Sequence, residues 1–195
     1  MTRVDLPIRL DRVTLRAFSV DDLDVFAEVH AQPEVTRYLC WEPRSRAEAS
    51  TALERRTTWT AFGTDDESLA LAIVANDDGR YLGEVLLWPV DLSNGGAEIG
   101  FLFSPAAAGH GYATEATRGL LDLAFGPLGL HRVVGQCDAR NDASARLMRR
   151  LGMRQEAHFR RNQKVKGEWC DGLVFAVLAE EWLGASPGEV SPPAG

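Results

Sequence analysis

Cysteine is scarce in this sequence, and long hydrophobic runs are absent from it. The three cysteines, Cys40, Cys137 and Cys170, form no CxxC spacing and cannot all pair with one another, which argues against a disulfide-stapled secreted domain. No apolar run approaches the roughly 20 residues of a membrane span, and the N-terminus lacks the apolar stretch of a signal peptide. We therefore expect a cytoplasmic protein that does not associate with membranes.

Positive charge is outnumbered by negative charge. The chain has 21 Lys and Arg residues against 28 Asp and Glu residues, a formal net charge of −7, so general binding of nucleic acid is not expected. A local basic patch or a cationic substrate is still compatible with this balance. A length of 195 residues suits one domain with a sizeable core. We expect that domain over residues 1–183 and a disordered tail, rich in Pro, Gly and Ser, over residues 184–195.

Hydrophobic periodicity predicts a chain of mixed α and β elements. Alternation over residues 12–18 predicts a strand. Capping boxes at Ser19 and Ser45 predict two helices, of which the first ends at Pro33 and the second runs to about Phe62. Further strands are expected at about 68–76, 81–92, 97–104, 131–139, 155–163 and 172–178, and further helices at 114–125 and 142–151. This order excludes an all-helical bundle and a plain doubly wound sheet.

Two glycines, Gly109 and Gly111, separate the strand expected at 97–104 from the helix that follows it. A helix start offers backbone N–H groups without intrahelical partners, together with the positive end of the helix dipole, and glycine lets a ligand approach closely. The stretch therefore predicts an anion site suited to phosphate, although a tight turn would also need glycine. Neither common nucleotide motif is present, because Thr114 breaks GxGxxG and the chain has no GxxxxGK(S/T).

Several stretches of the sequence resemble one known family. The run "AEIGFLFSP", followed by "GHGYATEA" and later by "NDASARLMRRLGM", is similar to the motifs of the GCN5-related N-acetyltransferase (GNAT) superfamily. The segments "LRAFSVDDLDVFAEV", "PEVTRYLCWEP" and "EWCDGLVFAVLAEEW" resemble its RimJ/RimL-like branch. The resemblance covers nearly the whole chain and implies an α+β (mixed α/β) fold. In the GNAT fold a central twisted mixed sheet of about seven strands is flanked by about four helices, with a splay between the two middle strands.

The resemblance implies acetyl-CoA (CoA) as co-substrate and no metal. It places the pyrophosphate on the amides of the glycine turn and the pantetheine on the backbone edge of the strand 97–104. It assigns cofactor contacts to Phe101, Leu102, Phe103, Ala108, Gly109, His110, Gly111, Tyr112, Ala113, Thr114, Asn141 and Ser144. Ala108 departs from the Gln or Arg common in the family, so His110 and Arg118 are expected to supply positive charge. Phe101 and Phe103 would also suit plain core packing, and Asn141 a helix N-cap.

The resemblance also places catalytic groups. Glu98 is the expected general base, because apolar neighbours should raise its pKa, although a structural carboxylate on a strand is the alternative. Many GNAT enzymes carry a Tyr acid where this chain has Met148, so proton return to the sulfur is left to Ser144 or water. On the acceptor side the candidates are Tyr38, Trp41, Trp169 and Asp171, each of which would also suit packing or an exposed hairpin.

The sequence therefore predicts an N-acetyltransferase that moves an acetyl group from acetyl-CoA to a primary amine by direct attack in a ternary complex. The acceptor is a protein N-terminal α-amine or a small-molecule amine. Two alternatives stay open: an acyl-CoA-binding regulatory module without turnover, and a transferase that uses another acyl group such as succinyl. A homodimer is also left open.

Overall fold

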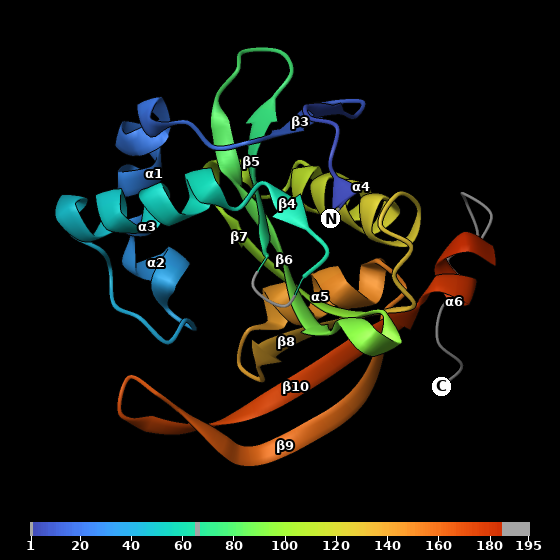
Figure 1. Cartoon of the computed structure of the whole chain (residues 1–195). Helices are drawn as coiled ribbons and strands as arrows, with labels where there is room; N and C mark the ends of the chain where they lie inside the picture. The colour runs from blue at the N-terminus through green and yellow to red at the C-terminus, as the bar shows by residue number, and fades with distance from the viewer. Residues whose placement is uncertain (1, 65–66, 185–195) are drawn as a thin grey trace.

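An eight-stranded sheet runs through the part of the chain that the computed structural model describes, residues 2–64 and 67–184 (Figure 1). Its strand order is β2-β3-β5-β6-β7-β8-β10-β9. The strands are β2 (Ile8–Arg9), β3 (Val13–Arg16), β5 (Leu69–Ala75), β6 (Tyr81–Asp91), β7 (Gly96–Phe103), β8 (Arg132–Asp138), β9 (Arg154–Val165) and β10 (Glu168–Leu178). Separately, β1 (Thr2–Arg3) pairs with β4 (Ala61–Phe62). The tail expected to be disordered lies outside the described residues from position 185 onward.

Helices cover both faces of the sheet. The α-helices are α1 (Leu23–His30), α2 (Pro33–Thr36), α3 (Arg46–Thr58), α4 (Tyr112–Phe125), α5 (Asp142–Arg150) and α6 (Ala179–Gly184). Three short 3-10 helices are η1 (Val20–Asp22), η2 (Leu92–Asn94) and η3 (Pro105–Ala107) among the described residues. α1 and α3 pack on one face, around Phe26 and Leu53, and α4 and α5 pack on the other, around Leu120 and Met148 (Figure 1). Each face therefore has its own core.

The fold confirms the predicted class, with local differences. Both capping boxes form, at Ser19 and at Ser45. The prediction that Pro33 ends the first helix is wrong: α1 ends at His30, and Pro33 is the first residue of α2, a position that tolerates its missing N–H. The second predicted helix also ends early, at Thr58, because the Trp59 carbonyl accepts from Ala70 N–H and leads the chain into β4.

The predicted splay is present between β7 and β8. These two strands are parallel, whereas the other neighbouring pairs in the described sheet are antiparallel. Their pairing begins at Gly96↔Arg132 and stops at Ile99↔Gly135. Beyond that point β7 continues to Phe103 with β6 as its partner, and β8 continues with β10. The edge of β7 from Gly100 to Phe103 is therefore not paired with β8.

Candidate active site

A cleft of about 1050 Å³ opens where β7 and β8 separate. Its lining comes from α2 and the loop after it, from Arg56 on α3, from β6, β7 and β8, from the turn before α4 and the first turn of that helix, and from one side of α5. These segments lie far apart in the sequence. The fold therefore brings the glycine turn, the strand that carries Glu98 and the helix start at Asn141 to one cavity.

The glycine turn starts α4 without help from a capping side chain. Gly111 is the N-cap residue with φ 79° and ψ 0°, and Gly109 also has φ 79°. A Cβ atom on Gly109 would meet nothing within 4 Å, so the left-handed backbone rather than crowding requires glycine there. Within residues 2–64 and 67–184, no side chain caps the first N–H groups of α4. These groups are free to hold an anion in the cleft.

Arginines from two directions surround this turn. Arg12 Nη1 donates to the His110 carbonyl at 2.8 Å, and Arg150 Nη1 donates to Thr114 Oγ1 at 3.1 Å. Arg146 and Arg150 line the cleft, one helical turn apart on α5. Arg118, in contrast, lies over the Trp182 ring at 5.1 Å and is not a lining residue. The positive charge next to the turn thus comes from arginines that the sequence analysis missed.

The other predicted cofactor residues divide into two groups. Phe101, Leu102, Phe103, Ala108, Ala113, Thr114, Asn141 and Ser144 line the cleft together with both glycines of the turn. His110 and Tyr112 do not line it; their rings stack on each other with centroids 5.6 Å apart. The Phe101 and Phe103 rings also pack against the core of the α4 face, so both of their predicted roles are compatible with the structure.

Glu98 lies on β7 directly before the splay. Its side chain lines the cleft and is half-buried, and Gln136 Nε2 donates to Glu98 Oε2 at 3.1 Å. Burial raises the pKa of the Glu98 carboxyl, and the hydrogen bond from Gln136 offsets part of that rise. A carboxylate with a raised pKa and access to a cavity is suited to accept a proton.

Asn141 caps α5, as the sequence analysis expected. Its Oδ1 accepts from the Ser144 N–H at 3.1 Å. Ser144 lies half-buried in the first turn of α5 and lines the cleft. Met148, one turn further on, is fully buried and its sulfur packs against Gly135. Ser144 is therefore the α5 hydroxyl that faces the cleft.

The four predicted acceptor residues do not come together. Tyr38 and Trp41 line the cleft from the loop after α2. Trp169 and Asp171 lie on β10 and are not lining residues; the Trp169 side chain is 56% exposed. Asp171 instead accepts from the Arg161 N–H at 2.8 Å and contacts His158 Nε2 at 2.9 Å, so its carboxylate fixes the β9–β10 hairpin.

A buried histidine supports the Trp41 ring. His30 stacks on Phe26 with centroids 3.8 Å apart and on Trp41 at 5.3 Å. Arg44 Nη1 lies 3.1 Å from His30 Nδ1. Because a guanidinium can only donate, the proton of the neutral ring lies on Nε2, 3.6 Å from Glu84 Oε1. Burial lowers the pKa of His30 to about 4.

The acceptor end of the cleft holds further residues that the sequence analysis missed. Glu84 and Arg56 line it, and Arg56 Nε donates to Glu84 Oε2 at 2.8 Å. Trp88, on the same strand as Glu84, also lines the cleft. Of these residues, only Glu84 could have been recognised from the sequence, because it is a carboxylate within the apolar run that forms β6.

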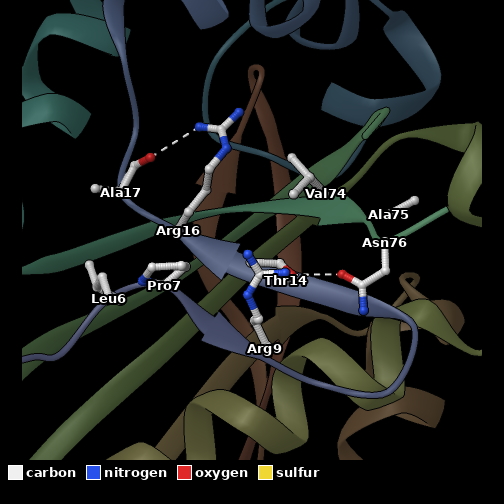
Figure 2. Close-up of a pocket in the computed structure, with 9 residues that line it drawn as sticks. All are labelled: Leu6, Pro7, Arg9, Thr14, Arg16, Ala17, Val74, Ala75 and Asn76. Atoms are coloured by element: carbon white, nitrogen blue, oxygen red, sulfur yellow. Dashed lines mark hydrogen bonds between the residues drawn. The ribbon is translucent and has the colours of Figure 1, made fainter. Parts of the chain in front are cut away.

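A second hollow, of about 500 Å³, lies beside β2 and β3 and contains none of the predicted site residues (Figure 2). Three of its polar side chains already have hydrogen-bond partners within the protein. Thr14 Oγ1 donates to Asn76 Oδ1 at 2.6 Å, and Arg16 donates to the Ala17 carbonyl and to Asp22. The cleft at the splay is therefore the candidate active site.

Comparison with known proteins agrees with this geometry. A family model described as "Acetyltransferase (GNAT) domain" matches residues 12–154. The chain is 28% identical over 174 residues to the uncharacterized N-acetyltransferase p20 of Bacillus licheniformis, covering 89% of this chain and 97% of that protein. It is 33% identical over 107 residues to the putative ribosomal N-acetyltransferase YdaF of Bacillus subtilis, covering 55% of this chain and 58% of that protein. The crystal structure of an acetyltransferase (GNAT family) from Bacillus anthracis superposes with a TM-score of 0.80 at 24% identity, covering 90% of this chain and all of that one.

Proposed function

Because the chain belongs to the GCN5-related N-acetyltransferase (GNAT) family, we propose that it transfers an acetyl group from acetyl-CoA to a primary amine. The observation that carries this proposal is the composition of one cleft. The cleft contains a helix start that follows two glycines and has no side-chain cap, a strand edge not paired with its neighbour, and a half-buried carboxylate with a raised pKa.

The residues present fit a CoA co-substrate. The N–H groups at the start of α4 and the guanidinium groups of Arg146 and Arg150 suit the phosphates. The backbone edge from Gly100 to Phe103 suits the amide-bearing pantetheine arm, which would pair with it as an added strand does. When bound, acetyl-CoA supplies an activated thioester. The chain's own residues then have to place an amine beside it and manage two protons.

Glu98 is proposed to take the proton from the acceptor amine, directly or through a water. An alkylammonium has a pKa of about 10 and an α-ammonium of about 8, so at neutral pH most of the amine has to lose a proton before it can attack. Gln136 holds the Glu98 carboxylate by one oxygen and leaves the other available. The nitrogen loses its second proton as the amide forms, and Ser144 or a water passes a proton to the leaving thiolate and takes up that second one in exchange.

Direct attack is preferred to a covalent acyl-enzyme. Cys137 lines the cleft, but burial raises the pKa of its thiol to about 11. At neutral pH this group is a thiol, which is a poor nucleophile. This supports a ternary complex in which the acyl carbon passes straight to the amine nitrogen: the N–C bond forms as the C–S bond breaks.

We propose two classes of acceptor amine. Tyr38 and Trp41 on the loop after α2 suit an extended peptide or an amine-bearing ring. Similarity to a putative ribosomal N-acetyltransferase supports the RimJ/RimL-like branch, and with it a protein N-terminal α-amine. A small-molecule amine is the other acceptor.

We further propose one domain over residues 1–183, in keeping with the match over residues 12–154, and a cytoplasmic location. Among the described residues, none of the helices has the length and apolar character needed to cross a bilayer.

Thiol release from acetyl-CoA with a panel of amines tests the proposal. The panel holds peptides with different N-terminal residues, polyamines and aminoglycosides, and the readout is free CoA. Amine-dependent release with at least one acceptor is the expected result. Tight binding of acetyl-CoA by calorimetry without release for any amine would instead identify an acyl-CoA-binding module. Release with succinyl-CoA but not with acetyl-CoA would change the acyl group.

A further inference from the structure

The indole of Trp88 lies against the neighbouring strand at Gly100. A Cβ atom on Gly100 would stand 2.4 Å from Trp88 Cη2 and 2.5 Å from Trp88 Cζ3. Real Cβ atoms do not approach so closely, so the ring occupies the space of a missing side chain. Gly100 does not have a positive φ. Glycine is therefore needed at this position to leave space for the indole, and not to allow a left-handed backbone conformation.

The ring lies where the splay begins. Gly100 directly follows Ile99, the last β7 residue that pairs with β8. The cross-strand partner of Trp88 is Glu98, and partners in an antiparallel pair have Cβ atoms about 5 Å apart. Trp88, Glu98 and Gly100 all line the cleft. The indole therefore lies beside the proposed base and at the Gly100 end of the strand edge proposed for pantetheine.

We propose that Trp88 limits the length of the acyl group that the protein accepts. The inference rests on the proposed function, because it takes the cleft to hold an acyl-CoA. An amine held at Glu98 has to reach the acyl carbon, so the acyl carbon must lie between the Gly100–Phe103 edge and Glu98. Acyl atoms beyond the first methyl then meet the Trp88 ring.

The ring has little room to retreat. On one side it rests on the β7 backbone at Gly100, where the Leu86 side chain also approaches to 3.6 Å of the same Cβ position. It packs against the core cluster of the α1 face, which includes Phe18, Tyr81 and Leu102. Protein interiors are packed closely enough that one additional methylene is felt. A short acyl group fits beside the ring, whereas a longer one has to displace it.

The test measures binding of acyl-CoA in the absence of an amine, so it does not depend on turnover. Calorimetry gives Kd for acetyl-CoA, propionyl-CoA and butyryl-CoA with wild type, Trp88→Ala and Trp59→Ala. Trp59 is the matched control, because it is a partly buried tryptophan of the same core cluster that does not line the cleft. In wild type, butyryl-CoA should bind roughly 10-fold or more weakly than acetyl-CoA, the discrimination typical of one or two methylenes in a pocket. Trp88→Ala should reduce this ratio to about 1, and Trp59→Ala should leave it unchanged.

A second variant works in the opposite direction and guards against misfolding of the first. Gly100→Ala should push the indole into the cleft and increase the acetyl preference over propionyl. Thermal unfolding checks that each variant is folded. An unchanged butyryl-to-acetyl ratio in folded Trp88→Ala, or a wild type that binds all three equally, would overturn the inference. The proposed function fails in a different assay, when wild type binds acetyl-CoA but no amine causes thiol release.

Discussion

Arg12 and Glu115, on opposite sides of the glycine turn, are joined by three contacts. The Arg12 backbone N–H donates to Glu115 Oε1 at 2.6 Å, its Nε donates to Oε2 at 2.8 Å, and Nη2 lies 2.8 Å from Oε2. The same guanidinium donates to the His110 carbonyl. The turn between β2 and β3 therefore holds the first turn of α4 and the loop before it.

Arg12→Ala should weaken CoA binding several-fold, because the turn loses both its support at His110 and a nearby positive charge. The Arg12 side chain is 49% accessible and the Glu115 side chain only 16%, but Glu115 keeps the backbone N–H groups of Arg12 and Val13 as donors, so the unfolding free energy should fall by about 1 kcal/mol. Arg9→Ala, an exposed arginine on the preceding strand, is the control. Calorimetry measures the CoA affinity of the two variants. Equal affinities would show that the contacts of Arg12 with Glu115 and His110 do not shape the site.

Gly111→Val should abolish CoA binding, because a left-handed backbone opposes a branched side chain and the side chain would cover the start of α4. The control is Gly129→Val, which places the same residue at another positive φ, 62°, with open space around it. Both changes should cost about 1–2 kcal/mol of stability from backbone strain. If Gly111→Val binds CoA as well as Gly129→Val does, the phosphates lie elsewhere.

Glu98→Gln should lower kcat by roughly 10²–10⁴, the usual contribution of a positioned general base. Since burial raises the pKa of Glu98, the wild-type rate should fall as the pH drops through that raised value and the carboxylate is protonated. Gln136→Ala removes the hydrogen bond that offsets the rise, so its acid limb should move to higher pH. A pH–rate profile of all three proteins decides; superimposable profiles for wild type and Glu98→Gln would reduce Glu98 to a structural residue.

Asn141→Ala and Ser144→Ala separate capping from catalysis. Loss of the Asn141 cap should cost about 1 kcal/mol of unfolding free energy and also weaken CoA binding. Ser144→Ala should keep wild-type stability, because the cap uses the Ser144 backbone N–H, and should lower kcat. Urea unfolding and steady-state kinetics measure the two effects. An unchanged kcat in Ser144→Ala would assign proton return to water.

His30 predicts a loss of stability in mild acid. Its pKa falls from 6.5 to about 4 on folding, so the unfolded chain binds the proton more tightly. Stability is then complete above about pH 7 and decreases as the pH drops from 6.5 toward 4, by about 3 kcal/mol at most. Urea unfolding at pH 7 and pH 5 should show a smaller decrease for His30→Phe than for wild type. Parallel decreases in the two proteins would contradict this role of His30.

Local patterns made much of the fold predictable. The capping boxes at Ser19 and Ser45 depend on residues three apart, and the glycine turn depends on two positions separated by one residue. Such features require no knowledge of distant contacts. The resemblance supplied the splay, which the register between β7 and β8 confirms. The end of α3 was missed because a long-range hydrogen bond, from Ala70 to Trp59, determines it.

The parts of the site that were missed depend on tertiary arrangement. Arg146 and Arg150 face the cleft only because of how α5 is rotated against the sheet, and no local pattern reports that rotation. Trp88 and Gly100 lie on different strands, so their contact follows from the β6–β7 register. The resemblance placed Trp169 and Asp171 on the acceptor side, but neither lines the cleft, and the Asp171 carboxylate instead accepts from Arg161 within the β9–β10 hairpin.

The way the splay closes has a consequence for aggregation. An unpaired strand edge usually invites strands from other molecules, which is why proteins protect their edges. The free edge of β7 lies inside the sheet, and the paired segment from Gly96 to Ile99 closes the opening at one end. A foreign polypeptide strand therefore cannot pair with β7 beyond Gly100 toward Gly96, whereas a thin ligand arm needs only the stretch from Gly100 to Phe103. The protein can keep backbone groups available for a ligand without offering other chains a surface to polymerise on.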